Sequence, residues 1–317
     1  MTRETITSKR RAVCRRIIYV ILFANSLNAI LKDLITSGLL RRRARSDYES
    51  GLFENAPISG KRDYLYEARL LHQLCSSHAM ARATLQKIAK EGGYEKLRFE
   101  NQQALTTLAE KHLHTLAKFK EEKILRLFEL VAQHTGEKIV VFCIYQETAI
   151  ALAEAIAKQF SGIQVRCTVA TREEELELIL DYFAPVANGR ISPEEGDNDF
   201  SARILENRID ILIASEAISE GYNLQDARIL INYDLPWSVL QLAQRMGRLM
   251  RPWHEPRELI IYNFVADTMF DKELKHGDTW RQRLDQRSRE HQSFANLPVM
   301  IQKGDAAVNL YALREAL

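Results

Sequence analysis

From residue 137 onward, short apolar runs alternate with stretches whose apolar residues recur at helical period. Lys138–Cys143 and Ile209–Ala214 are almost fully apolar and rich in β-branched residues, as in parallel strands buried on both faces. Repeated strand–helix units of this kind predict a parallel α/β sheet with right-handed crossovers. The expected strands are Lys138–Cys143, Ile163–Val169, Ile209–Ala214, Arg228–Tyr233 and Glu258–Val265, and the expected helices are Glu147–Phe160, Arg172–Phe183 and Val239–Met250.

Residues 1–134 show no strand-like alternation, and we predict that they are helical. Tyr64–Ala89 and Asn101–Val131 carry apolar residues at a helical period. Ile17–Leu31 is also apolar, and we predict a buried helix there. A targeting or anchoring segment is the alternative, although fifteen residues fall short of the roughly 20 that a membrane span needs.

The pattern divides the chain into three parts. We expect a helical region with a basic N-terminal segment at 1–134, an α/β lobe at 135–270 and a helical tail at 271–317. Within the lobe, Pro185–Ser201 is acidic and rich in turn residues, which predicts a surface insertion.

The formal net charge of +2 conceals an asymmetry along the chain. Residues 1–45 hold eleven Lys and Arg against two acids, whereas the remaining 272 residues hold 33 basic and 40 acidic side chains. The chain is therefore a basic head on a mildly acidic body, and not a uniformly basic nucleic-acid coat. The run Arg41–Arg45 is either a nucleic-acid contact or a solvated loop.

The four cysteines, Cys14, Cys75, Cys143 and Cys167, are widely spaced and form no C-x-x-C pair. This spacing argues against a disulfide scaffold and against a structural zinc site. We therefore expect no metal bound by the chain's own residues, and a reducing, cytoplasmic setting.

Ser215–Gln225 directly follows an expected strand and contains Gly221 and Asn223. Open α/β sheets place their ligands at the carboxyl ends of strands, and glycine permits close backbone approach. Small polar groups there suit phosphate or ribose. A polar turn capped by Ser215 is the simpler reading.

Gln244–Arg251 has arginines at 245, 248 and 251, which lie along one side of the expected helix. Gly247 costs a helix interior roughly 1 kcal/mol relative to alanine, which points to close packing or a ligand. A row of guanidiniums facing a cleft suits the charge that spreads during phosphoryl transfer. A solvated basic face is the alternative.

The order and spacing of these segments resemble the second motor lobe of superfamily 2 helicases. The resemblance is strongest to the Swi/Snf-like branch, close to the bacterial RNA-polymerase-associated ATPases. Ser215–Gln225 resembles motif V, Gln244–Arg251 resembles motif VI, and Lys138–Cys143 lies where motif IV is expected. Leu74–Ser77 resembles the helical segment that precedes this lobe.

The resemblance implies a RecA-like sheet with helices on both faces, and a role for each matched residue. Arg248 and Arg251 would be arginine fingers that reach the ATP γ-phosphate across the interlobe cleft, and Gln244 would help to sense nucleotide. Arg245 would belong to the nucleotide-binding set and anchor the motif to the opposite lobe. Gly221 and Asn223 would lie beside the nucleotide. The nucleic-acid backbone would contact Ser215, Glu220 and Cys143 with the loop that follows it.

The sequence lacks the parts that such a motor keeps in its first lobe. A P-loop needs G-x-x-x-x-G-K-[ST], but the only Gly-Lys, at Gly60-Lys61, is followed by Arg62 and preceded by Asn55 where the first glycine belongs. No Asp-Glu dipeptide occurs. We therefore expect ATP with Mg²⁺ to be bound mainly by a partner P-loop lobe, and hydrolysis only when that lobe completes the site.

Two functional hypotheses remain open. The first is the carboxy-terminal half of an ATP-dependent helicase or translocase, with DNA as the expected track. The second is a non-catalytic nucleic-acid-binding or regulatory module derived from such a motor. Intact Gln244, Arg248 and Arg251 favour the first, because a pure binding module has no need of finger arginines.

Overall fold

The structure is a computed structural model of the whole chain. It describes residues 14–23 (backbone), 33, 69–70, 72–91, 102–116, 118, 120–169, 171–191, 206–215, 222–236, 239–250, 253 and 257–266. The predicted tail at 271–317, the run Arg41–Arg45 and much of the predicted insertion Pro185–Ser201 lie outside these residues.

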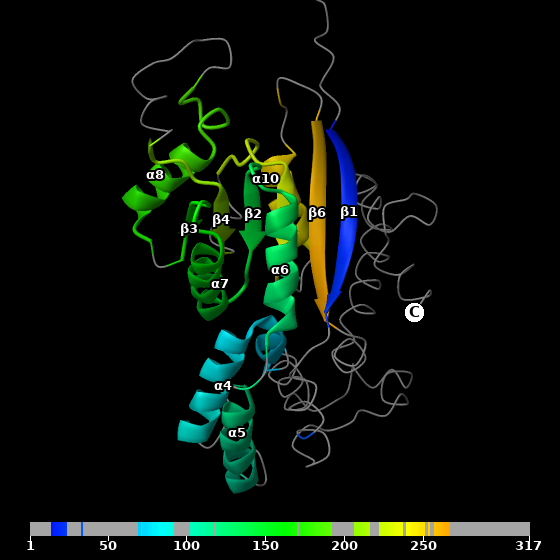
Figure 1. Ribbon diagram of the computed structural model, residues 1–317, viewed down its shortest axis with the longest axis vertical. Coiled ribbons are helices and arrows are strands. Elements are labelled where there is room, and N and C mark those ends of the chain that lie inside the picture. Colours follow the sequence, from blue (N-terminus) through cyan, green and yellow to red (C-terminus); the bar gives the residue numbers. More distant parts are fainter. Residues whose placement is uncertain are drawn as a thin grey trace, which may run out of the picture.

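The described strands form one parallel sheet in the order β1-β6-β5-β2-β4-β3 (Figure 1). Without β1, this order places the first strand of the lobe at the centre of the sheet, where the chain changes direction, as in doubly wound folds. The predicted parallel α/β lobe of the RecA-like kind is therefore confirmed. The strand bounds are β1 Cys14–Phe23, β2 Ile139–Phe142, β3 Val165–Cys167, β4 Ile211–Ala214, β5 Ile229–Asn232 and β6 Arg257–Ala266.

The three central strands are short and are buried on both faces of the sheet. Every residue of β2, β4 and β5 is buried. Ile139 of β2 lies opposite Ile211 of β4 and Ile229 of β5, so the three apolar runs start in register. Since side chains alternate across the sheet, each strand contributes to two cores, one above and one below.

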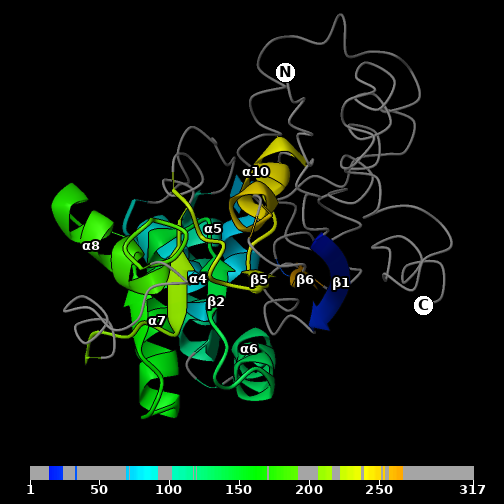
Figure 2. The same cartoon turned by 90° about the horizontal axis from the view of Figure 1, so that it is seen from above.

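Helices cover both faces of the sheet, as Figure 2 shows from above. On one face, α6 and α7 pack against Ile139, Val141 and their neighbours. On the other face, α8 and α10 pack against Val140 and Phe142. The bounds are α6 Glu122–Gln133, α7 Gln146–Gln159, α8 Glu173–Phe183 and α10 Val239–Leu249.

Two further helices, α4 (His78–Glu91) and α5 (Gln102–Leu116), lie beyond the carboxyl ends of the strands (Figure 1). They confirm the helical pattern expected in this region. The stretch Asn101–Val131 is two helices, α5 and α6, because the chain leaves the helical conformation between Leu116 and Glu122.

The helix predicted at Ile17–Leu31 is wrong over its first part. Cys14–Phe23 is instead the strand β1, which pairs in parallel with β6 over ten residues, from Cys14 opposite Arg257 to Phe23 opposite Ala266. A short apolar run fits a buried strand as well as a buried helix, and its β-branched residues favour the strand. No helix in the described part of the chain is long and apolar enough to cross a membrane.

Candidate nucleotide and nucleic-acid site

Helix α10, which carries the motif VI residues, is fixed to the sheet by Arg245. The side chain is fully buried. Its Nη1 donates to Asn232 Oδ1 at 3.1 Å and to the Asp234 carbonyl at 2.8 Å, and its guanidinium lies 4.9 Å from the centre of the Phe142 ring. A buried guanidinium is tolerated only where acceptors compensate its lost hydration, so these contacts hold α10 against the ends of β2 and β5.

This position differs from the role expected for Arg245. We expected an anchor to an opposite lobe, whereas the contacts that the structure shows for Arg245 hold it to its own sheet. The three-residue spacing placed Arg245 beside Arg248 on the helix, but it could not show that the helix is rotated to bury the first arginine.

Arg248 and Gln244 are half-buried on α10, one turn from each other, and Arg251 lies outside the described residues. Gly247, between them, is exposed, and no atom of the described residues lies within 4 Å of the position that a Cβ would take. The close packing suggested for Gly247 is therefore absent among the described residues.

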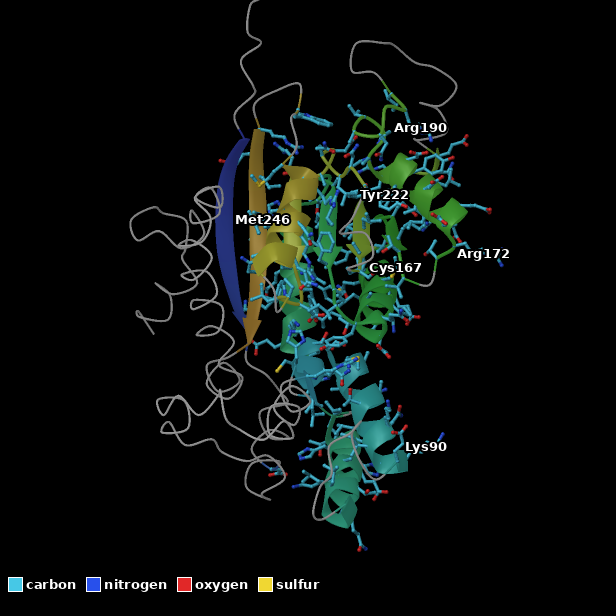
Figure 3. All side chains as sticks on the ribbon, turned by 180° about the vertical axis from the view of Figure 1, so that it is seen from behind. Lys90, Cys167, Arg172, Arg190, Tyr222 and Met246 are labelled. Atoms are coloured by element: carbon cyan, nitrogen blue, oxygen red, sulfur yellow. The ribbon has the colours of Figure 1, made fainter. Side chains whose placement is uncertain are left out.

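The motif V turn lies beside the end of α10. Leu224 N donates to the Arg248 carbonyl at 3.3 Å, which joins the two motifs directly. Asn223 Nδ2 donates to the Ala187 carbonyl at 3.3 Å. Figure 3 marks Met246 of α10 and Tyr222 of the turn, and both side chains pack into the core shared by α8, α10 and the sheet.

Ser215 and Cys143 follow the neighbouring strands β4 and β2. Ser215 is half-buried, whereas Glu220 and Gly221 lie outside the described residues. Cys143 is fully buried, and its backbone N–H donates to the Ala214 carbonyl at 2.9 Å. Burial raises the pKa of the Cys143 thiol well above its ordinary value. Its side chain therefore does not present the surface contact that we expected at this position.

A buried polar cluster lies at the carboxyl ends of β2 and β5, centred on Asp234. Lys123 Nζ donates to Asp234 Oδ1 at 3.0 Å, while Ser76 Oγ and the Ile144 backbone N–H donate to Oδ2 at 2.8 and 3.1 Å. Burial by itself raises the pKa of Asp234, but the charge of Lys123 and the hydrogen bonds from Lys123 and Ser76 outweigh it and lower the pKa below 3.8. Asp234 is therefore an ionised hub that joins α6, the segment before α4 and the loop after β2.

His72 ties the same segment to the loop that leads into α10. Its Nε2 lies 3.1 Å from the Leu235 carbonyl and its Nδ1 lies 2.8 Å from Tyr145 Oη. Since a carbonyl only accepts, Nε2 donates to Leu235, and in the neutral imidazole Nδ1 accepts from Tyr145 Oη. Burial lowers the pKa of His72 below 6.5.

The lowered pKa of His72 predicts a loss of stability in mild acid. Below pH 6.5, the ordinary pKa of histidine, His72 takes up a proton in the unfolded chain but not in the folded chain. The contribution of His72 to folding stability is therefore complete above that pH and decreases as the pH falls below it. Urea unfolding between about pH 7.5 and pH 5.5 measures the slope. His72→Gln, which keeps a donor for Leu235, should reduce the slope, whereas exposed His114→Gln should not; an unchanged slope in His72→Gln would refute the assignment.

The sequence did not reveal this cluster as part of the site. Lys123 and Ser76 are separated from Asp234 by 111 and 158 residues, so no local pattern joins them. The nearest signal was the resemblance of Leu74–Ser77 to the segment that precedes the helicase lobe.

The parallel sheet with helices on both faces defines a RecA-like lobe. Residues 120–252 match the helicase conserved C-terminal domain family. The chain is 42% identical over 73 residues to the uncharacterized ATP-dependent helicase YqhH of Bacillus subtilis, covering 23% of this chain and 13% of YqhH. It is 31% identical over 147 residues to the RNA polymerase-associated protein RapA of Yersinia pestis, covering 45% of this chain and 13% of RapA.

DEAD-box ATP-dependent RNA helicase 40 of Oryza sativa subsp. japonica is 26% identical over 147 residues, which cover 46% of this chain and 15% of that protein. Over residues 120–252 the chain is therefore similar to the carboxy-terminal domain of superfamily 2 helicases. The matched segments span only about a seventh of these relatives.

Proposed function

We propose that this chain supplies the arginine-finger half of an ATP-dependent nucleic-acid translocase of the Swi/Snf-like type. Arg248 and Arg251 neutralise the charge that develops on the γ-phosphoryl group, and Gln244 senses the bound nucleotide. The P-loop comes from a lobe outside these 317 residues. The likeness to RapA supports the Swi/Snf-like assignment.

The observation that carries the proposal is the way in which Arg245 holds α10. A fully buried guanidinium bound to Asn232 and Asp234 fixes the rotation of the helix. Arg248, three residues later, is thereby kept half-buried on a rigid element. Rigid placement of a cation matters for catalysis, because preorganised charge stabilises a transition state without reorganisation during the reaction.

The Mg²⁺ that accompanies ATP does not fit the described part of this lobe. Those residues include no group of three His, Cys, Asp or Glu side chains that could hold a metal ion. The proposal therefore assigns the ion to the P-loop lobe and routes no step through it here.

Nucleic acid would contact the carboxyl ends of the strands through Ser215 and Glu220, with Gly221 and Asn223 on the nucleotide side of the same turn. Contacts to the phosphate backbone are independent of sequence and weaken with salt. We propose DNA as the track and the cytoplasm as the compartment. An RNA track is the alternative outcome of a binding titration with both nucleic acids.

The direct test is ATP hydrolysis by the purified chain with saturating DNA or RNA. We expect no turnover above background, because finger arginines alone do not cradle the phosphates, and turnover only after a separately expressed P-loop lobe of a superfamily 2 helicase is added. Turnover of about 1 per second or faster by the chain alone, abolished by Arg248→Ala, would contradict the half-site proposal.

A second candidate is a nucleic-acid-binding or regulatory module that has lost the motor. Both candidates account for the lack of G-x-x-x-x-G-K-[ST] within these 317 residues. The second candidate predicts unchanged DNA binding and no hydrolysis even when a P-loop lobe is supplied, so the same assay separates the two candidates.

A further inference from the structure

Arg257, the first residue of β6, contacts two separate segments of the candidate site, the motif V turn and the end of α10. Its Nη1 donates to the carbonyl of Gln225 in the motif V turn and lies 3.5 Å from the carbonyl of Ala227. Its Nη2 donates to the carbonyl of Leu249, the last residue of α10. One half-buried guanidinium therefore bridges motif V and the end of motif VI.

The same guanidinium also contacts the chain beyond α10. It lies 5.0 Å from the centre of the Trp253 ring, a cation–π distance. In sequence, Arg251 lies between Leu249 and Trp253. Arg257 thus contacts both the last residue of α10 and Trp253, while Arg251 lies outside the described residues.

The chemistry of the bridge favours arginine over lysine. The last carbonyls of a helix carry partial negative charge and lack intrahelical donors, so a cation there is stabilising. A planar guanidinium presents several donors in fixed directions and can serve two carbonyls at once, whereas an ammonium is a point charge on a flexible stem.

Other contacts fix the far side of the same turn. Asp226 accepts hydrogen bonds from the backbone N–H groups of Val186 and Ala187, at 3.1 and 2.8 Å. Leu224 N donates to the Arg248 carbonyl at 3.3 Å. The turn at 222–227 is therefore held between the segment after α8 and the end of α10, so a displacement of the turn reaches α10 through Leu224 and Arg257.

We propose that Arg257 is a positioning residue that couples the motif V turn to the carboxyl end of α10, the helix that carries Arg248. The functional part of this inference rests on the proposed function, because it explains how a nucleic-acid contact at motif V would change the position of the arginine fingers. The structural coupling itself stands on the contacts of Arg257 and is testable in the chain alone.

The test is amide hydrogen exchange of the full chain, read by mass spectrometry at 222–227 and at the end of α10. Arg257→Met should accelerate exchange in both segments by about tenfold or more, because it removes charged hydrogen bonds to both. Arg257→Lys should not return both segments to the wild-type rate of exchange. Arg228→Met is the matched control, because this arginine precedes β5 and pairs with Glu137 on the surface, and it should leave both segments unchanged.

Three results would overturn the coupling. Arg257→Met could leave exchange in both segments at the wild-type rate, or accelerate it in only one of them. Arg257→Lys could keep both segments fully protected. If Arg257→Met does not fold, the comparison of Arg257→Lys with the wild type decides. In a motor completed by a P-loop lobe, Arg257→Met should lower kcat about tenfold or more with little change in KM for ATP. An inactive wild type would refute the proposed function, while the exchange result would still decide the coupling.

Discussion

Arg248→Ala is expected to lower kcat of the completed motor by about a thousandfold or more, with KM for ATP changed by about twofold at most. An arginine finger acts on charge that exists mainly in the transition state, so its loss appears in turnover more than in substrate binding. Arg248 is suited to this role because it is half-buried on a helix whose rotation Arg245 fixes.

Steady-state hydrolysis with saturating nucleic acid measures the effect. Arg126→Ala is the matched control, because Arg126 also lies on a helix but is exposed and pairs with Glu129 at 2.9 Å; it should keep wild-type turnover. Arg248→Lys should recover only part of the loss, since an ammonium lacks the planar fork. Wild-type kcat in Arg248→Ala would remove Arg248 from the catalytic set.

Asp234→Ala is expected to destabilise the lobe by about 3–5 kcal/mol, the range for removing one partner of a buried ion pair. The side chains of Lys123 and Asp234 are only 6% and 2% exposed, so Lys123 would be left buried without its carboxylate. The variant also deprives Ser76 Oγ and the Ile144 N–H of their acceptor. Because the folded-state pKa of Asp234 is lowered from 3.8, its stabilisation is present above that pH and is lost as the pH falls below it.

Urea unfolding at neutral pH measures this loss. Lys123→Met combined with Asp234→Ala should cost less than the sum of the single variants, because neither charge is then buried alone. Glu137→Ala breaks a more exposed ion pair with Arg228 and should cost less than about 1 kcal/mol. A cost for Asp234→Ala as small as that of Glu137→Ala would show that the cluster does not hold the lobe together.

Sequence patterns predicted the centre of the sheet closely, because local composition decides it. Ile139–Phe142, Ile211–Ala214 and Ile229–Asn232 are apolar runs too short for helices and are buried on both faces. The amphipathic helices between them follow from their period. The order of the strands is not specified by the repeat, since β2 pairs with β4 and β5 and not with β3, the next strand along the chain.

β1 could not be predicted in the same way, because its partner is remote. Cys14 pairs with Arg257, so the strand is specified by a contact across most of the chain. The apolar run Ile17–Leu31 carries no alternation that would distinguish a two-sided strand from a buried helix. The tertiary partner, and not the local pattern, decides the conformation.

Sequence patterns singled out the segments of the candidate site but could not give the direction of their side chains. The motif resemblance identified the turn after β4 and the helix α10, and the structure joins them through Leu224 and Arg248. Whether an arginine in a three-residue row is buried depends on the rotation of the helix against the sheet. For Arg245, acceptors on Asn232 and Asp234 determine that rotation.

The most direct test asks whether this chain completes a nucleotide site on another lobe. The complex is trapped with ADP, Mg²⁺ and aluminium fluoride, which together mimic the transferring phosphoryl group. Sedimentation of the purified chain with a separate P-loop lobe is the measurement. We predict a stable complex of the two with the trapped analogue and none with ADP alone, and loss of that complex in the double variant Arg248→Ala/Arg251→Ala. A wild-type chain that forms no complex, or a double variant that forms it equally well, would contradict the account.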